Sequence, residues 1–223
     1  MEQLKAVLVD IDGTLVDSND AHAHAWVDAL TEAGYTAPFV RVRKLIGKGG
    51  DKVLPEMTGI AKDSAQGKRI TARRTEIFKE NYLPGLRPFP GARRLLERMH
   101  EEGLRIVAAT SANEDEMKAL LEVTGAPELF YQATSSGEAA HSKPDPDIVE
   151  AALTKAGCEA QQAFLLGDTP YDVEASLRAS VRPVALRSGG WSDDDLRGAI
   201  VIYDSAEDLL HHYEQSPLGQ ERR

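Results

Sequence analysis

The stretch VLVDIDGTLVDS, Val7–Ser18, places two aspartates directly after an apolar run. The apolar run has the composition typical of a buried strand, and the glycine and threonine that follow the aspartates favour a turn. In open parallel sheets, ligands gather outside the carboxyl ends of the strands. The stretch therefore predicts a first strand that delivers Asp10 and Asp12 to a ligand site.

Short apolar runs alternate with longer amphipathic segments along the rest of the chain, which is typical of an α/β protein. Right-handed crossovers between such strands make the sheet mostly parallel, so we expect a Rossmann-like three-layer sandwich. The expected strands are Lys5–Val9, Leu104–Ala109, Tyr131–Ala133, Ala163–Leu166, Val181–Leu186 and Ala199–Tyr203, and the expected helices between them include Gly91–Glu102, Glu114–Val123 and Asp147–Ala156.

One interval, residues 16–88, has only helical pattern and interrupts the alternation. The stretch LPGLRPFPG, Leu83–Gly91, is dense in proline and glycine and is typical of a hinge. We therefore predict an inserted helical cap domain at 16–88 and a catalytic core made of 1–15 and 89–223. The helices expected in the cap are Ala21–Glu32, a segment near Val40–Ile46, Asp51–Met57 and Ala65–Tyr82.

Composition narrows the classes of function. The 223 residues are 42% hydrophobic and carry a formal net charge of −10. No segment approaches the roughly 20 apolar residues of a membrane span, and no signal peptide pattern precedes the first strand. We therefore expect a cytoplasmic protein without membrane contact. Lysine and arginine are scattered, apart from Arg69, Arg73 and Arg74, which we interpret as a solvated helix face, so a nucleic-acid partner is not expected.

Cys158 is the single cysteine, which excludes an internal disulfide and a multi-cysteine zinc site. The final residues, SPLGQERR, have the composition of a frayed tail.

Polar side chains follow the expected strands at the edge where ligands gather. Carboxylates, hydroxyls and one amine occur there, in this chain order: Asp10, Asp12, Thr110, Ser111, Lys143, Asp168 and Asp172. Converging carboxylates repel each other and require cations to stay ionised. Mg²⁺ and Lys143 meet that need, because Mg²⁺ takes oxygen ligands and accepts a substrate phosphate. The edge is therefore suited to a phosphoryl group, held also by Thr110 and by N–H groups of the Gly13 turn.

Four segments carry a resemblance to a known family. DIDGTL, AATSA, SKPDPDI and GDTPYD occur in this order and are similar to the four motifs of the haloacid dehalogenase superfamily. The core accounts for about two-thirds of the chain. The helical insertion resembles the small cap of the branch that includes phosphoglycolate phosphatases and β-phosphoglucomutases. The resemblance implies a phosphoric monoester hydrolase.

The resemblance also implies a role for each residue of the edge. Asp10 would be the nucleophile that becomes an aspartyl phosphate, and Asp12 the general acid and then the base. Thr110, Ser111 and Lys143 would hold the phosphoryl oxygens. Four aspartates would form the Mg²⁺ site: Asp10, Asp12 through its backbone carbonyl, Asp168, and Asp172 either as a ligand or in the outer shell.

Simpler explanations exist for each residue taken alone. A D-x-D-G-T segment can be only a capped turn, Lys143 can be solvated, and Asp168 and Asp172 can cap a helix. An EF-hand starting at Asp10 is excluded, since Leu15 would stand where the loop needs glycine. The ordered set of strand-end residues makes chance an inadequate explanation.

Three other activities compete with the phosphatase hypothesis. A phosphomutase would use the same phosphoaspartate but pass the phosphoryl group to another hydroxyl. A receiver-like phosphoacceptor domain also groups acids, a threonine and a lysine at strand ends. A dehalogenase proper is disfavoured, because Asp12 is the phosphotransferase hallmark.

The cap loop LIGKGGDKVL, Leu45–Leu54, is expected to contact the substrate. Its glycines and the helix start behind them can bind an anionic or hydroxylated group, although a plain helix–helix turn would have the same composition. The residues assigned to substrate choice are Gly47, Lys48, Gly49 and Gly50. Related β-phosphoglucomutases have an arginine where this chain has Gly50, which weakens the mutase hypothesis unless Lys48 or Lys52 substitutes for it.

The histidines receive no role from the sequence. His22 and His24 are two residues apart, which places them on different faces of a helix, and His141 is interpreted as a loop residue. The expected substrate is a small phosphorylated metabolite, either a sugar phosphate or a phosphoglycolate-like acid. The expected oligomeric state is a monomer or a weak dimer.

Overall fold

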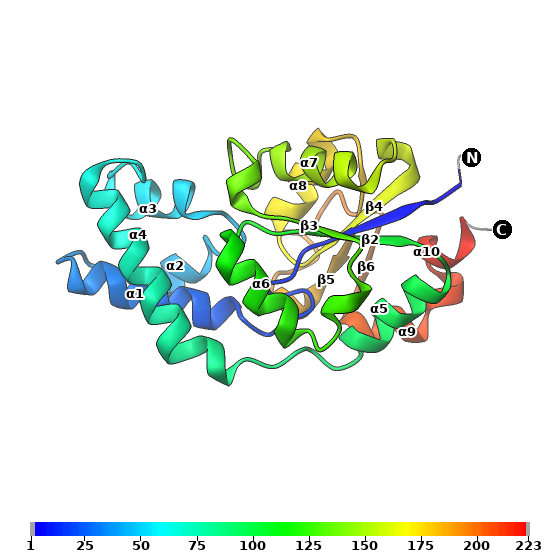
Figure 1. Cartoon of the computed structure of the whole chain (residues 1–223), viewed down its shortest axis with the longest axis horizontal. Helices are drawn as coiled ribbons and strands as arrows, with labels where there is room; N and C mark the ends of the chain where they lie inside the picture. The colour runs from blue at the N-terminus through cyan, green and yellow to red at the C-terminus, as the bar shows by residue number, and fades with distance from the viewer. Residues whose placement is uncertain (1–2, 222–223) are drawn as a thin grey trace.

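The computed structural model describes residues 3–221 and has an α/β fold with a helical insertion (Figure 1). The described residues form a six-stranded sheet in the order β3-β2-β1-β4-β5-β6, with all neighbouring strands parallel. The strands are β1 (Ala6–Val9), β2 (Arg105–Ala109), β3 (Gln132–Thr134), β4 (Ala163–Gly167), β5 (Arg182–Leu186) and β6 (Val201–Tyr203). The expected strands are therefore confirmed, with small shifts at their ends.

Helices cover both faces of the sheet because the side chains of its central strands are buried on both sides. Leu8 of β1 belongs to the apolar cluster that includes α7 (Asp147–Ala156) and α8 (Pro170–Arg178). Val7 and Val9 belong to the cluster on the other face. Figure 1 shows α5 and α6 on the side of the sheet opposite α7. The helices packed in the second cluster include α5 (Ala92–Glu101), α6 (Glu114–Val123) and α9 (Ala206–His211).

The insertion lies beyond the carboxyl end of the sheet, at the left of Figure 1. The two segments that connect the core to the insertion run side by side. Val16 pairs with Pro88 in a β-bridge, and Phe89 N–H donates to Leu15 O at 2.8 Å. The insertion helices are α1 (Asn19–Glu32), α2 (Phe39–Arg43), α3 (Gly50–Thr58) and α4 (Ala65–Ile77), and α4 continues as a π-helical turn, Phe78–Tyr82. The division into a core domain and a cap domain, with boundaries at 15/16 and 88/89, remains a proposal.

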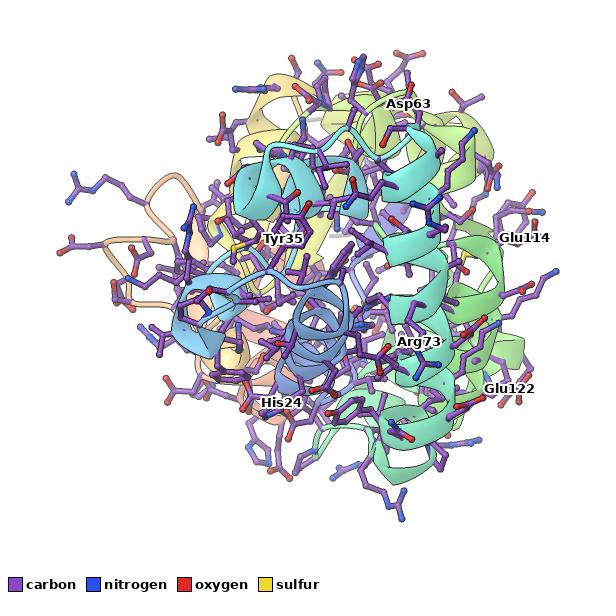
Figure 2. The ribbon with its side chains drawn as sticks, turned by 90° about the vertical axis from the view of Figure 1, so that its left-hand side faces the viewer. His24, Tyr35, Asp63, Arg73, Glu114 and Glu122 are labelled. Carbon is purple, nitrogen blue, oxygen red and sulfur yellow. The ribbon has the colours of Figure 1, made fainter. Side chains whose placement is uncertain are left out.

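Two expectations about the outer parts of the chain are wrong. Arg74 is not on a solvated face: it is 8% exposed, whereas its neighbour Arg73 lies on the outer face of the insertion (Figure 2). The terminal segment is not frayed up to Gln220, because α10 (Pro217–Gln220) buries Leu218 and is capped by Ser216. Within residues 3–221, no helix combines the length and the apolar character needed to cross a bilayer.

Candidate active site

Three buried carboxylates meet at the carboxyl edge of the sheet. Asp10 follows β1, Asp168 follows β4, and Asp172 lies in the first turn of α8. One oxygen from each lies within 4.8 Å of the others, and the three side chains are almost fully buried. Asp168 and Asp172 are four residues apart where β4 leads into α8, and the parallel pairing of β1 with β4 brings Asp10 to them.

Lys143 supplies one positive charge to this cluster. Its Nζ lies 2.6 Å from Asp10 Oδ1 and 2.7 Å from Asp172 Oδ1, and its side chain is 1% exposed. The pKa of Lys143 is raised, because attraction to Asp10 and Asp172 outweighs its burial. Asp172 also serves α8, since its Oδ2 accepts from Thr169 N–H at 3.1 Å and from Thr169 Oγ1 at 2.6 Å. The helix cap and the charge cluster thus share this aspartate.

The cluster carries more negative charge than Lys143 can balance. Burial raises the pKa of Asp10 well above its ordinary value against the attraction of Lys143, and the carboxylates of Asp172, Asp168 and Asp12 add to the rise. Burial and the charge of Asp172 raise the pKa of Asp168 to about 7. Both shifts reflect burial first and repulsion among the carboxylates second, and a divalent cation would offset the two together. A set of buried carboxylate oxygens fits a hard cation such as Mg²⁺.

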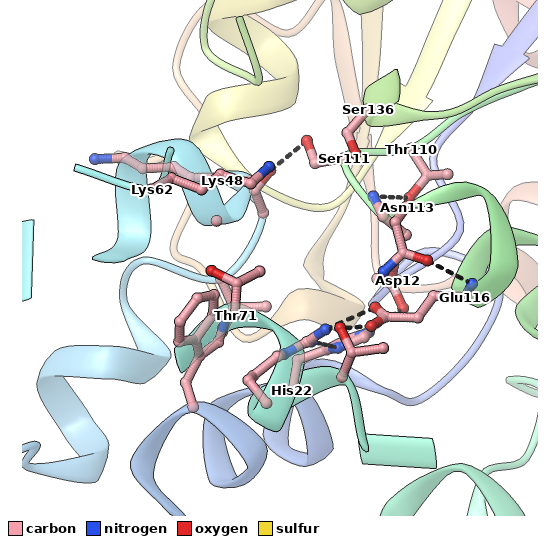
Figure 3. A pocket seen from close by; sticks show the side chains of 18 of the residues that line it. Asp12, His22, Lys48, Lys62, Thr71, Thr110, Ser111, Asn113, Glu116 and Ser136 are labelled. Atoms are coloured by element: carbon pink, nitrogen blue, oxygen red, sulfur yellow. Dashed lines mark hydrogen bonds and ion pairs between the residues drawn. The ribbon is translucent and has the colours of Figure 1, made fainter. Parts of the chain in front are cut away.

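A cavity of about 190 Å³, lined in part by Asp10, lies between the core and the insertion, and Figure 3 shows the side chains around it. Its core wall includes Asp12, Thr110, Ser111 and Ser136, and its insertion wall includes Trp26, the loop Gly47–Gly50, Lys62, Thr71 and Arg74. Lys143, Asp168 and Asp172 do not line it, but they lie close to Asp10, which does. The structure therefore brings the nominated residues into two layers, a cavity wall and a charge cluster beneath it.

The cap loop packs closely on the core. Gly49 N–H donates to Ser142 Oγ at 2.9 Å, and a Cβ on Gly49 would lie 2.6 Å from Ser142 Cβ. Ser111 Oγ donates to Gly47 O at 3.2 Å, so this predicted phosphate ligand contacts the loop. A Cβ on Gly50 would lie 3.2 Å from the Trp26 ring. The glycines thus permit close approach of the insertion to the core.

The two loop lysines proposed as substitutes for an arginine are already paired. Lys48 Nζ lies 2.6 Å from Glu56 Oε1, and it also lies over the Tyr171 ring. Lys52 Nζ lies 2.6 Å from Asp145 Oδ2 and does not line the cavity. Both ammonium groups are therefore paired with carboxylates and are not free to bind a second phosphate.

Asp12 is held by the insertion. Ser18 Oγ donates to Asp12 Oδ1 at 2.5 Å, and His22 Nε2 donates to the same oxygen at 2.7 Å. Burial raises the pKa of Asp12, but its interactions with His22 and Ser18 outweigh burial, and the net pKa lies below the ordinary value. No residue of 3–221 donates a hydrogen bond to Asp12 Oδ2, which leaves that oxygen for proton exchange with a substrate or water.

An ion pair connects this contact to the core. Arg74 Nη1 lies 2.7 Å from both carboxylate oxygens of Glu116, and Arg74 Nη2 donates to His22 Nδ1. Because arginine can only donate, His22 Nδ1 accepts this hydrogen bond, and Nε2 is the ring atom that donates to Asp12. Burial raises the pKa of Glu116, but the charge of Arg74 outweighs it and holds the net pKa below the ordinary value. The chain Glu116–Arg74–His22–Asp12 thus spans the cavity from α6 to the insertion and back to β1.

The similarity of the sequence to a known family identifies the class of protein. The sequence profile of the haloacid dehalogenase-like hydrolases matches residues 7–186, most of the chain. The chain belongs to this family. Among its relatives, the phosphoglycolate phosphatase of Rhodospirillum rubrum is 31% identical over 216 residues, which cover 92% of this chain and 89% of the relative.

Other relatives of this haloacid dehalogenase-like hydrolase agree in fold and chemistry. The N-acetylmuramic acid 6-phosphate phosphatase of Pseudomonas aeruginosa is 26% identical over 93% of this chain and 94% of its own. The crystal structure of a hydrolase from Pseudomonas syringae has a TM-score of 0.88 at 27% identity, covering 95% of this chain and 98% of the other. The protein is a phosphatase of this family, with a helical cap.

Sequence reasoning missed His22, Arg74 and Glu116 in this haloacid dehalogenase-like hydrolase. His22 was compared only with His24, although His22 and Trp26 are four residues apart on α1 and both line the cavity. That spacing was the available signal for His22. Arg74 and Glu116 are 42 residues apart in different elements, and each looks like a surface charge of an ordinary helix. No local pattern in the sequence predicts that Arg74 and Glu116 form an ion pair.

Proposed function

We propose that the protein hydrolyses a small phosphomonoester through an aspartyl phosphate on Asp10, with Mg²⁺ as cofactor. The observation that carries the proposal is the position of Asp10, which lies on the cavity wall while its carboxylate also belongs to the cluster with Lys143, Asp168 and Asp172. A carboxylate so placed can attack a phosphoryl group that enters through the cavity, while Lys143 and a bound cation offset the negative charge that gathers at Asp10.

The first half-reaction breaks the ester bond. An Asp10 oxygen attacks phosphorus, the bond from phosphorus to the leaving oxygen breaks, and Asp12 gives that oxygen its proton. Thr110, Ser111 and Lys143 are assigned to the phosphoryl oxygens. Ser111 must release Gly47 O to do so, which a rotation of its side chain allows.

The second half-reaction restores the enzyme. A water attacks phosphorus, the bond from phosphorus to Asp10 breaks, and Asp12 accepts the proton of the water. The low pKa of Asp12 suits this step, since the group stands ready as a base. In the first step the same residue must take up a proton before the leaving group departs, and its unshared Oδ2 is the atom available.

Mg²⁺ would be held by Asp10, Asp168 and the Asp12 carbonyl, with Asp172 acting through Lys143. We assign Asp172 to the outer shell, because its Oδ2 accepts from Thr169 and its Oδ1 lies beside Lys143 Nζ. When bound, Mg²⁺ supplies charge to the developing phosphoryl transition state and offsets the repulsion among the carboxylates.

The size and charge of the cavity indicate a small, polar leaving group. Ligand pockets for drug-sized molecules are commonly ~300–1,000 Å³, whereas this cavity is about 190 Å³. Arg74, Lys48 and Lys62 lie in its insertion wall. Sugar phosphates and phosphoglycolate-like acids therefore lead the list, and the names of the relatives support both classes of phosphomonoester.

A panel of phosphorylated metabolites tests the proposal. Released phosphate is measured with Mg²⁺, with excess EDTA, and with Mg²⁺ restored, for the native protein and for Asp63→Asn as an exposed carboxylate control. We expect turnover that requires Mg²⁺ and that the control retains. Transfer of the phosphoryl group to a second hydroxyl without phosphate release would establish a mutase, and a stable phosphoprotein without turnover would establish a phosphoacceptor; either result overturns the proposal.

A further inference from the structure

Asn19, the first residue of α1, contacts the metal-site candidate Asp168 from the insertion. Its Nδ2 donates to Asp168 Oδ2 at 2.9 Å, and the residue is 2% exposed. The other amide atom, Oδ1, is buried and has no hydrogen-bond partner among residues 3–221. The amide orientation is fixed by chemistry, because the Asp168 carboxylate can only accept and so must face the NH₂ group.

The surroundings hold this amide in one place. A Cβ on Gly13 would lie 2.0 Å from Asn19 Nδ2 and 2.2 Å from Asp168 Oδ2, so Gly13 leaves only enough room for the amide against the carboxylate. Thr14 Oγ1 donates to the second oxygen of Asp168, Oδ1, at 2.9 Å. Asp168 is thus oriented from both sides, and the Asn19 amide cannot turn away without breaking its bond.

A buried carbonyl oxygen without a donor is unfavourable, and such atoms in proteins are commonly satisfied by a fixed water. Mg²⁺ keeps several waters when it binds carboxylates, and those waters are strong donors. A site that joins a carboxylate cluster to an unpartnered acceptor therefore has the composition expected of an outer coordination shell.

We propose that Asn19 is a positioning residue of the cation site, with its Nδ2 orienting Asp168 and its Oδ1 accepting a hydrogen bond from a water on the bound cation. The inference rests on the proposed function, since it assumes a cation at Asp10 and Asp168. It adds a link between the cation and the insertion, because Asn19 belongs to the first turn of α1. Cation occupancy then stabilises the point where the chain enters the insertion.

Thermal unfolding against Mg²⁺ concentration tests this without measuring turnover, because a ligand that binds only the folded state raises the Tm. The variants are Asn19→Ala, Asn19→Asp and, as a control, Asn81→Ala at an exposed asparagine of the insertion. We expect Asn19→Ala to raise the Mg²⁺ concentration at half-maximal stabilisation by about 10- to 100-fold, the usual effect of removing an outer-shell partner. Asn81→Ala should match the native protein.

Asn19→Asp separates positioning from packing. A carboxylate beside Asp168 should lower the Tm without Mg²⁺ and enlarge the rise with Mg²⁺, since the cation then relieves an added repulsion. A half-maximal concentration for Asn19→Ala within about two-fold of native, or equal Mg²⁺ responses of the Ala and Asp variants, overturns the inference. If the native protein gains no Tm with Mg²⁺, the proposed cofactor fails as well; if only the Asn19 effects are missing, the proposed function stands and the role of Asn19 does not.

Discussion

The Arg74–Glu116 ion pair should hold the cap closed over the substrate, and Glu116→Gln is the perturbation that tests this. Arg74 is on the insertion and Glu116 is on the core, and their side chains are 9% and 2% exposed. When the cap opens, both groups reach water. The pair therefore stabilises the closed state selectively, and removing one charge penalises closure.

The size of the effect follows from burial. Removing one partner of a buried ion pair costs about 3–5 kcal/mol, because the other charge stays buried and uncompensated. Glutamine keeps an oxygen that can accept from Arg74, so the low end, about 3 kcal/mol, is expected for Glu116→Gln. Since each 1.4 kcal/mol is about ten-fold in rate, kcat/KM should fall by about 10².

The assay is kcat/KM from phosphate release with the best substrate of the panel. Glu122→Gln, an exposed glutamate of the same helix, is the matched control and should retain native kcat/KM (Figure 2). In Arg74→Met/Glu116→Met the two losses should be far from additive, because no charge remains buried alone. A Glu116→Gln enzyme within about three-fold of native, or additive losses in the double variant, would refute the reasoning.

Three further predictions follow from the site. His22→Ala should move the basic limb of the pH–kcat/KM profile to higher pH, because His22 lowers the pKa of Asp12, the general acid of the first half-reaction, and an unmoved limb would contradict this. In the absence of metal, the free energy of unfolding should fall by roughly 2–4 kcal/mol between pH 4 and pH 7, because the pKa of Asp168 is raised to about 7 in the folded state. Mg²⁺ or the substitution Asp168→Asn should reduce this dependence of the unfolding free energy on pH, as measured by denaturant titrations. Gly49→Ala should impair kcat/KM on p-nitrophenyl phosphate as well as on the natural ester, because its Cβ would collide with Ser142 and hinder closure; a loss confined to the natural ester would instead make the loop a pure specificity element.

The expectation for Gly49 shows how the structure changed one interpretation. From the sequence, the loop glycines were assigned to substrate choice because they precede a helix start. In the structure they do line the cavity, yet Gly49 is fixed by contact with Ser142, 93 residues away. Glycine permits close packing of two segments and also permits close approach of a ligand, so the sequence alone could not show which of the two Gly49 serves.

The catalytic edge was predictable because its residues follow buried strands. Asp10, Thr110 and Asp168 each come directly after an apolar run, and parallel pairing then forces them together. The helical insertion was predictable for a similar reason, since strand patterns stop at Val16 and resume after Pro88. The pattern of apolar residues along the chain therefore predicted both the sheet and the position of the site.

The residues that act between the insertion and the core were not predictable. Arg74 sits in a helix rich in arginine, and only the packing of α4 on α1 turns it inward, against the rings of Trp26 and Phe78. Asn19 has the composition of a helix start, and its contact with Asp168 spans 149 residues. Such contacts depend on how two pieces dock, which no local pattern encodes.

Covalent capture of the phosphoenzyme tests the central claim most directly. The native protein is mixed with its best phosphomonoester and Mg²⁺, quenched in acid within the first turnover, digested, and read by mass spectrometry. The proposed mechanism predicts one added phosphoryl group on the peptide that contains Asp10, absent from Asp10→Asn and retained in Asp63→Asn. A phosphoryl group on any other residue, or full phosphatase activity in Asp10→Asn, would contradict it.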